Sequence, residues 1–315
     1  MNSWLKKISR IILAVCMTCL LLNYRHDLVI WRRAELPSAI TNAIVFYVTQ
    51  DIYACSALVN IYTLQQVVGS QARIIVMVSK DVSTNLIQRL REKQVTLVRK
   101  EPPPLPSDSI SYYQGCLLKL VVFGLHEIDP SVERALVLDS DQLVLRNLDS
   151  VFETSFKDIT AAPAYWIDNQ TLSSTCMLIE PSLALWGKVR QALETIRPGQ
   201  YDMDIINEQF GGQASQLSGS YSTLNSHWED HNIPKWFEVS ESSESVAKFT
   251  LHQKLHHLYL QSHVIHFTAV GKPWMYDAEQ LQRLRPDAHP LLLTQWVKWR
   301  AIAMRECPAG LVDHV

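Results

Sequence analysis

The chain lacks any cysteine pattern that would indicate a metal site or a disulfide framework. It has six cysteines among 315 residues, without the close, regular spacing of metal ligands. We interpret the cysteines outside the N-terminal apolar run as isolated small core residues. They are Cys55, Cys116, Cys176 and Cys307, whereas Cys16 and Cys19 lie within that run.

The chain also lacks a strong charge of either sign. Its formal net charge is −2, and no long basic run follows the N-terminus, so nothing indicates nucleic-acid binding. No internal repeat is visible. With 47% hydrophobic residues, the chain is long enough for one large core, or for one domain with extensions.

No apolar run reaches the length of a comfortable membrane span. The run from Ile11 to Leu22 is short against the roughly 20 residues that a spanning helix needs. Basic residues on both sides nevertheless favour an uncleaved type II signal-anchor within residues 1–24, with a cytoplasmic tip and a stem over 25–40. A cleaved signal and an amphipathic extension stay open. The basic residues are Lys6, Lys7, Arg10, Arg25, Arg32 and Arg33.

This N-terminus predicts a single-pass protein of the Golgi or another secretory membrane, with cytoplasm as the alternative. The sequon Asn169-Gln170-Thr171 agrees with a lumenal domain, although such triplets also arise by chance.

Strand-length apolar runs alternate with helical stretches through residues 41–275. Such alternation predicts an α/β domain with a largely parallel sheet covered on both faces. Residues 276–315 predict a helical extension packed back on that domain. The expected strands are 43–48, 73–78, 95–98 and 135–138; the expected helices are 54–68, 81–93 with Asp81 as N-cap, and 112–125.

The most informative stretch places two carboxylates at the end of a buried strand. Residues i and i+2 of an extended chain point to the same side, so Asp139 and Asp141 can converge on one point beyond Leu138. Converging carboxylates repel unless a positive charge lies between them. A hard divalent cation fits that requirement, and the C-terminal edge of such a sheet is where ligands bind.

Two further segments carry residues that could take part in binding or catalysis. His266 ends a short apolar run and offers an imidazole to a metal, while Gly271 permits close backbone approach and Lys272 supplies a cation. Asp202 and Asp204 open a predicted helix. The alternative is that these two carboxylates only stabilise the helix dipole, which favours negative charge in the first turn.

Together these segments resemble the signatures of the glycogenin-like, family-8 retaining glycosyltransferases. The matching residues are Asp139-Ser140-Asp141, the stretch 202–207 and the stretch from His266 to Trp274, with Lys119 in the helix before the Asp-x-Asp strand and Thr49 to Tyr53 after the opening strand. The resemblance covers about residues 43–275 in the family's order and spacing.

This resemblance implies a GT-A fold, a UDP-sugar donor and Mn²⁺ or another divalent cation. It implies that Asp139, Asp141 and His266 hold the metal, that Gly271 and Lys272 lie at the nucleotide diphosphate, and that Ser140 is a further cofactor-binding residue. Thr49, Gln50 and Tyr53 would meet the uridine. The catalytic residues beside the donor sugar would be Lys119, Asp202 and Asp204. The reaction would transfer a hexose or N-acetylhexosamine to a glycan or glycoprotein acceptor.

The chain departs from the family pattern on the sugar side. Met203 stands where the family often has glutamine, and Ser173 and Thr175 stand where it usually reads Asn-x-Gly. These changes leave open a catalytically idle sugar-nucleotide-binding protein. A phosphohydrolase that forms an aspartyl-phosphate is less favoured, because about 90 residues of α/β pattern precede the Asp-x-Asp strand.

Overall fold

The computed structural model describes residues 41–110, 113, 115–156, 158–212, 214–237 and 249–312. The expected signal-anchor and stem (residues 1–40) lie outside these ranges. No helix in the ranges just given is both long and apolar enough to cross a membrane.

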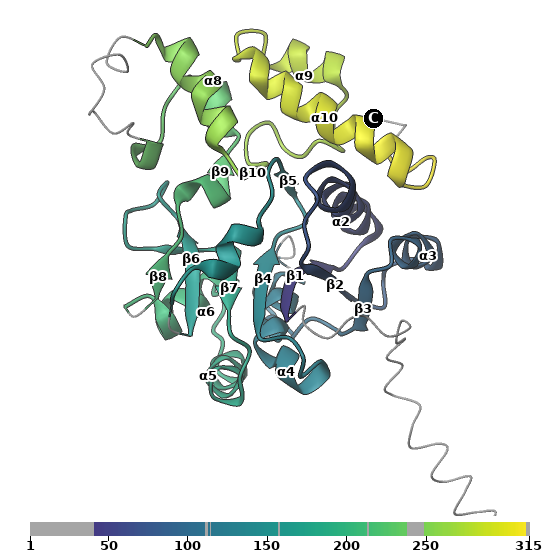
Figure 1. Ribbon diagram of the computed structural model, residues 1–315, viewed down its shortest axis with the longest axis vertical. Coiled ribbons are helices and arrows are strands. Elements are labelled where there is room, and N and C mark those ends of the chain that lie inside the picture. The colour runs from purple at the N-terminus through teal and green to yellow at the C-terminus, as the bar shows by residue number, and fades with distance from the viewer. Residues whose placement is uncertain are drawn as a thin grey trace, which may run out of the picture. The chain divides into compact units, whose positions relative to one another are not determined.

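A seven-stranded sheet forms the centre of the domain, in the order β3-β2-β1-β4-β7-β6-β8 (Figure 1). The four strands from β3 to β4 run parallel, whereas β7 is antiparallel to both β4 and β6. The predicted mostly parallel α/β sheet is therefore confirmed, and the part of the sheet beyond β4 contains both antiparallel and parallel pairs. The strands are β1 (Asn42–Val48), β2 (Arg73–Val78), β3 (Thr96–Arg99), β4 (Arg134–Leu138), β6 (Ile159–Pro163), β7 (Leu172–Ile179) and β8 (Ser215–Gln216).

Helices cover both faces of this sheet (Figure 1). Alternate residues of β1 enter different cores: Ile44 and Phe46 face the side of α2, while Ala43 and Val45 face the side of α5 and α6. Burial on both faces is the reason these strands read as continuous apolar runs. The helices are α2 (Asp51–Tyr62), α3 (Thr84–Glu92), α4 (Leu125–Ile128), α5 (Leu183–Glu194), α6 (Asp202–Phe210), α7 (Ser226–Glu229), α8 (Leu251–Gln261), α9 (Ala278–Leu284) and α10 (Pro290–Glu306).

A small second sheet joins distant parts of the chain. Strand β10 (Val264–His266) pairs antiparallel with β5 (Gln142–Val144) and parallel with β9 (Thr223–Leu224). Because β5 follows β4 after only three residues, this sheet lies directly beyond the C-terminal end of β4.

Three local expectations differ from the structure. The α3 helix is capped by Ser83, not by Asp81. The first predicted helix starts earlier, at Asp51, and continues from α2 into a π-helical turn (Thr63–Val67). The segment expected as a helix over 112–125 is a 3₁₀-helix (Cys116–Gly124) followed by α4; its first residue lies outside the described ranges.

The expectation of isolated cysteines is wrong for one pair. Cys55 on α2 and Cys307 at the end of α10 form a disulfide across 252 residues of sequence. Cys116 and Cys176 are free thiols. The pairing fastens the C-terminal helix to α2, and no spacing rule links two cysteines so far apart.

Candidate functional site

The Asp-x-Asp turn is held from both sides by hydrogen bonds to its middle residue. Strand β4 ends at Leu138, and the turn leads into β5. The Ser56 hydroxyl donates to the Ser140 carbonyl at 2.5 Å, and the Ser140 hydroxyl donates to the Tyr47 carbonyl at 2.9 Å. These bonds fix the turn so that the two flanking carboxylates are presented at the sheet edge.

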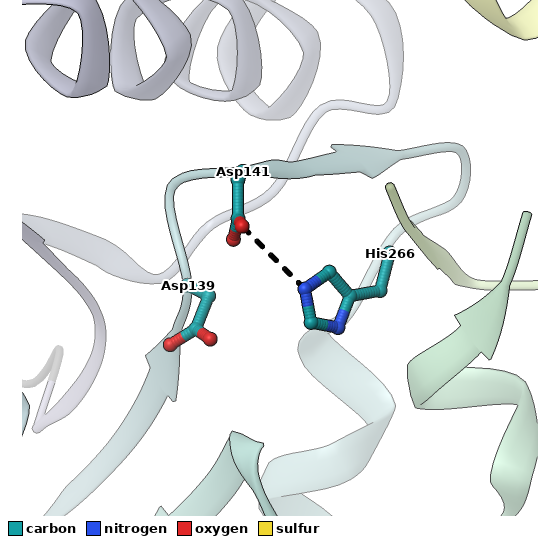
Figure 2. A group of neighbouring side chains, drawn as sticks. All are labelled: Asp139, Asp141 and His266. Carbon is teal, nitrogen blue, oxygen red and sulfur yellow. Dashed lines mark ion pairs between the residues drawn. The ribbon is translucent and has the colours of Figure 1, made fainter. Parts of the chain in front are cut away.

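His266 reaches the two carboxylates through the pairing of β10 with β5. Its backbone is opposite Gln142, the residue that follows Asp141. One ligand atom from each of Asp139, Asp141 and His266 lies within 4.8 Å of the others, and Figure 2 shows the three side chains converging. The buried Nδ1 of His266 has no hydrogen-bond partner. Two carboxylates and an imidazole are a suitable donor set for a divalent cation, and Nε2 is the His266 nitrogen that faces Asp141.

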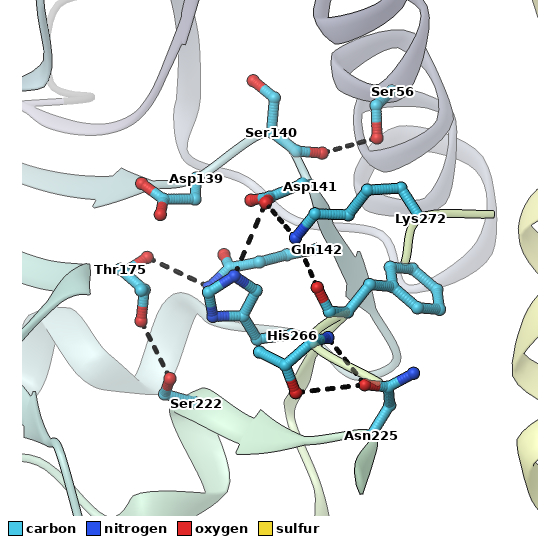
Figure 3. Close-up of polar contacts among 12 residues, drawn as sticks. Ser56, Asp139, Ser140, Asp141, Gln142, Thr175, Ser222, Asn225, His266 and Lys272 are labelled. Carbon is cyan, nitrogen blue, oxygen red and sulfur yellow. Dashed lines mark hydrogen bonds and ion pairs between the residues drawn. The ribbon is translucent and has the colours of Figure 1, made fainter. Parts of the chain in front are cut away.

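Lys272 approaches the same group from the loop after β10 (Figure 3). Its Nζ lies 2.6 Å from Asp141 Oδ2, and His266 Nε2 lies 3.5 Å from the same oxygen. Burial alone would raise the pKa of Asp141, but His266 and Lys272 together hold it far below its usual value. Asp141 is therefore ionised under all ordinary conditions.

A second charged group lies beside the first and shares Asp139. The Lys119 ammonium is 2.7 Å from Asp139 and 2.7 Å from Asp202, with only 3% of its side chain exposed. Burial would lower the pKa of Lys119, but the two carboxylates outweigh it and raise that pKa. Lys119 thus remains charged and joins the Asp-x-Asp turn to the start of α6.

The two carboxylates that Lys119 joins differ in their electrostatics. Burial raises the pKa of Asp139 despite the neighbouring ammonium, and its Oδ1 also accepts a 2.8 Å hydrogen bond from the Tyr47 hydroxyl. For Asp202, burial is outweighed by Lys119 and by the Ser174 hydroxyl, which donates at 2.5 Å, so its pKa is lowered. Asp202 is therefore a fixed, ionised carboxylate.

The loop that carries Lys272 is shaped by Asn225 and by two left-handed residues. Asn225 Oδ1 accepts hydrogen bonds from the backbone of Thr268 and Ala269, at 2.7 and 2.8 Å. Val270 and Gly271 have φ of +59° and +91°. The strain of a left-handed valine is consistent with a loop whose shape serves a site.

The residues predicted to meet a uridine lie at the start of α2. Gln50 caps this helix, and Thr49 packs against Gly115, where an added Cβ would come within 2.8 Å of the Thr49 methyl carbon. Tyr53 stands edge-on to Trp274, with ring centroids 5.7 Å apart. Tyr53 therefore contacts the loop that carries Lys272, although it comes from the opposite end of the domain's sequence.

Asp204 differs from the other predicted site residues in its surroundings. It is exposed, and its Oδ2 accepts a 2.9 Å hydrogen bond from the Tyr201 backbone at the first turn of α6. This is the dipole-stabilising arrangement that is common at helix starts. The structure therefore brings Asp202, but not Asp204, into the charged group around Lys119.

Several residues at the site were not predicted from the sequence. Four such residues form hydrogen bonds to a predicted site residue or to the loop that carries one: Tyr47, Ser56, Ser174 and Asn225. Tyr47 and Ser174 lie at the ends of strands adjacent to β4, so the sheet order was the missing signal. Ser56 and Asn225 are polar residues buried without exposed surface, which a sequence pattern does not distinguish from exposed ones.

Comparison with curated proteins places the chain beside a group of fungal proteins. No protein-family profile matches it. A protein named glucose N-acetyltransferase 1 from Gibberella zeae is 27% identical over 267 residues, covering 78% of this chain and 56% of that protein. Its namesake from Aspergillus fumigatus is 24% identical over 295 residues, covering 81% and 73%. The chain thus spans little more than half of the first relative's length.

Comparison with solved structures identifies the fold. The bifunctional glycosyltransferase WbbM superposes with a TM-score of 0.58 at 12% identity, covering 88% of this chain and 53% of that one. The galactosyltransferase LgtC, solved with donor and acceptor sugar analogues, gives 0.55 at 16% identity, covering 84% and 95%. At such identities the likeness establishes a GT-A-like fold.

Proposed function

We propose that the protein is a metal-dependent retaining glycosyltransferase of the glycogenin-like family 8. It would move a hexose or N-acetylhexosamine from a UDP-sugar to a glycan or glycoprotein acceptor. The observation that carries the proposal is the convergence of Asp139, Asp141, His266 and Lys272, here called the clamp, from segments more than a hundred residues apart.

The charges of the site suit a nucleotide diphosphate held through a cation. Asp139, Asp141 and Asp202 supply three carboxylates, against two ammonium groups from Lys119 and Lys272. This excess of negative charge favours a divalent cation, and the group then becomes positive enough to attract a diphosphate. Manganese is proposed from the resemblance to family 8, and the mixed oxygen and nitrogen donor set is compatible with it.

The chain's own groups have separate roles in the proposed reaction. When the bond between the sugar and the phosphate breaks, negative charge grows on the departing diphosphate, where Lys272 is placed to donate a hydrogen bond. A bound divalent cation would supply further stabilisation of that charge. Asp202 would face the developing positive charge on the sugar.

Asp202 is better suited to electrostatic stabilisation than to nucleophilic attack. Its Oδ2 is engaged by both Lys119 and the Ser174 hydroxyl, and 11% of its side chain is exposed. A carboxylate so bound has less electron density to give to a carbon atom. We therefore propose that an acceptor hydroxyl attacks from the same face that the diphosphate leaves and passes its proton to the departing phosphate oxygen, without a covalent intermediate on Asp202.

The disulfide supports a secretory location for the domain. Disulfides persist in oxidising compartments and are rare in reduced cytosol. The Cys55–Cys307 bond therefore favours the Golgi or another lumenal compartment over the cytoplasmic alternative. Anchoring through residues 1–24 remains a proposal made from the sequence.

An idle sugar-nucleotide-binding protein is the second candidate. The Thr175 hydroxyl forms hydrogen bonds with the hydroxyls of Ser173 and Ser222, both at 2.8 Å. The side chain that departs from the family pattern is therefore engaged within the protein. Such a site can retain the nucleotide and yet lack the contacts that orient a sugar for transfer.

A panel of UDP-sugars tests the proposal. The purified protein is incubated with UDP-glucose, UDP-N-acetylglucosamine, UDP-galactose or UDP-xylose in manganese or in chelator, and released UDP is measured. We expect slow release from at least one donor in manganese only. A parallel incubation with acetyl-CoA and glucosamine, which offers the amino group that glucose lacks, tests the N-acetyl transfer that the relatives' name describes. UDP binding without release in any donor would favour the idle protein, and acetyl transfer without UDP binding would refute the proposal.

A further inference from the structure

The C-terminal helix α10 contacts the segment that presents the Asp-x-Asp carboxylates. The indole of Trp299 is fully buried, and its Nε1 donates a 3.0 Å hydrogen bond to the Ser56 hydroxyl. That hydroxyl in turn donates to the Ser140 carbonyl at 2.5 Å. A continuous chain of two hydrogen bonds therefore runs from α10, through α2, to the residue between Asp139 and Asp141.

The same helix also contacts the segment that presents Lys272. The ring of Trp299 lies 5.6 Å from that of Trp274, centroid to centroid. The next residue, Arg300, donates a 3.1 Å hydrogen bond to the Pro273 carbonyl. Pro273 and Trp274 directly follow Lys272, so one turn of α10 supports both separate segments of the clamp.

The disulfide fixes α10 in the place that these contacts require. Cys55 is the residue before Ser56, and its bond to Cys307 holds the last turn of α10 against α2. Groups that must converge on one ligand are effective only when neighbouring residues restrict their motion. The contacts of α10 restrict the motion of the two segments together.

We propose that Trp299 is a positioning residue of the clamp. Through its contacts with Ser56 and Trp274, it holds the Asp-x-Asp turn and the Lys272 loop in fixed positions relative to each other. The proposal rests on the proposed function for its catalytic meaning, but its structural content is independent of it. It makes the C-terminal helix part of the nucleotide site, although α10 itself supplies no metal ligand among the residues described.

A pair of tryptophan variants separates positioning from general stability. Trp299→Phe keeps a stacking ring and removes the donor to Ser56. Trp228→Phe is the matched control, because Trp228 is also fully buried and donates a 3.1 Å hydrogen bond from its indole, in this case to the Leu255 carbonyl. Each variant loses one buried indole hydrogen bond, so we expect similar losses of thermal stability.

The first readout is UDP affinity measured in manganese and in chelator. We expect Trp299→Phe to weaken UDP binding about fivefold in manganese, as fits the loss of one buried hydrogen bond, and Trp228→Phe to change it less than twofold. Once Ser56→Ala has removed the middle of the chain, Trp299→Phe should have little further effect on this affinity. Equal losses in the two single tryptophan variants would overturn the proposal.

The second readout does not depend on nucleotide binding. Hydrogen exchange should become faster at the Asp139 and Met275 amides in Trp299→Phe and stay unchanged in Trp228→Phe. The Asp139 amide donates to the Thr175 carbonyl where the Asp-x-Asp turn begins, and the Met275 amide donates to the Lys272 carbonyl in the other turn. Unchanged exchange at both turns in Trp299→Phe would refute the positioning role. Absence of UDP binding by the native protein would instead refute the proposed function, and the exchange result would still decide the role of Trp299.

Discussion

Replacing Lys119 by methionine should destabilise the fold more than any other single change at the site. The lysine is the shared ion-pair partner of Asp139 and Asp202. Its side chain is 3% exposed, and each of the two carboxylate side chains is 11% exposed. Methionine keeps most of the volume but leaves two carboxylates buried without their cation. Removing one partner of a buried ion pair typically costs about 3–5 kcal/mol. For a domain of this size we expect a fall in Tm of roughly 6–20 °C at pH 7.5.

The pH dependence of this loss has a definite sign. In the native protein the pKa of Asp202 is lowered by Lys119, so its ionised form adds stability at neutral pH, and that contribution is lost as the pH falls below the ordinary range of a carboxyl group. Without Lys119, burial is opposed only by the hydrogen bonds from Ser174 and Cys116, and the pKa of Asp202 should rise. The difference in unfolding free energy between native and variant protein should therefore narrow from pH 7.5 to pH 5.

The assay is thermal and urea unfolding of the native protein, Lys119→Met and the control Lys100→Met, which removes one exposed ammonium group. Adding manganese should recover part of the Lys119→Met loss, because a cation bound by Asp139 replaces part of the missing positive charge. A Lys119→Met variant as stable as the control at pH 7.5 would refute the view that this buried triad is held together by its charges.

Three further outcomes are expected. Asp141→Asn should abolish manganese-dependent UDP release and leave Tm within a few degrees of native, because the residue lies at a turn outside the core; release with native manganese dependence would remove Asp141 from the metal site. His266→Ala should weaken UDP binding in manganese far more than in chelator, whereas equal weakening would indicate a structural histidine. Cys307→Ser should lower the unfolding free energy by about 2–5 kcal/mol, measured by urea unfolding under non-reducing conditions, since it opens a covalent loop of 252 residues; native stability would show that the disulfide does not form.

Most of the fold and the core of the site follow from local patterns in the chain. The strand before Asp139 is a continuous apolar run, and the i, i+2 geometry places both carboxylates on one side without knowledge of any other element. The chemistry of His266 and Lys272 could be read from the sequence, but only the resemblance joined them to the two carboxylates, because their approach depends on β10 pairing with β5 across the sequence.

What could not be predicted depends on long-range packing. Cys55 and Cys307 have no spacing signal, and Trp299 reads as an ordinary apolar position on a helix until its indole is seen to face Ser56. Asp204 shows the converse. Its spacing beside Asp202 suggests a shared role, yet residues i and i+2 of a helix point to nearly opposite sides, and Asp204 is exposed and bonded to the backbone of Tyr201.

The central claim is that Asp139, Asp141 and His266 bind a divalent cation that holds a nucleotide diphosphate against Lys272. The most direct measurement is a crystal structure with UDP and Mn²⁺, with the metal located by its anomalous scattering. The account predicts one strong anomalous peak coordinated by the three side chains and by diphosphate oxygens, with Lys272 Nζ turned from Asp141 to the phosphate. An ordered UDP bound with no anomalous peak at these residues, or a peak elsewhere, would contradict it.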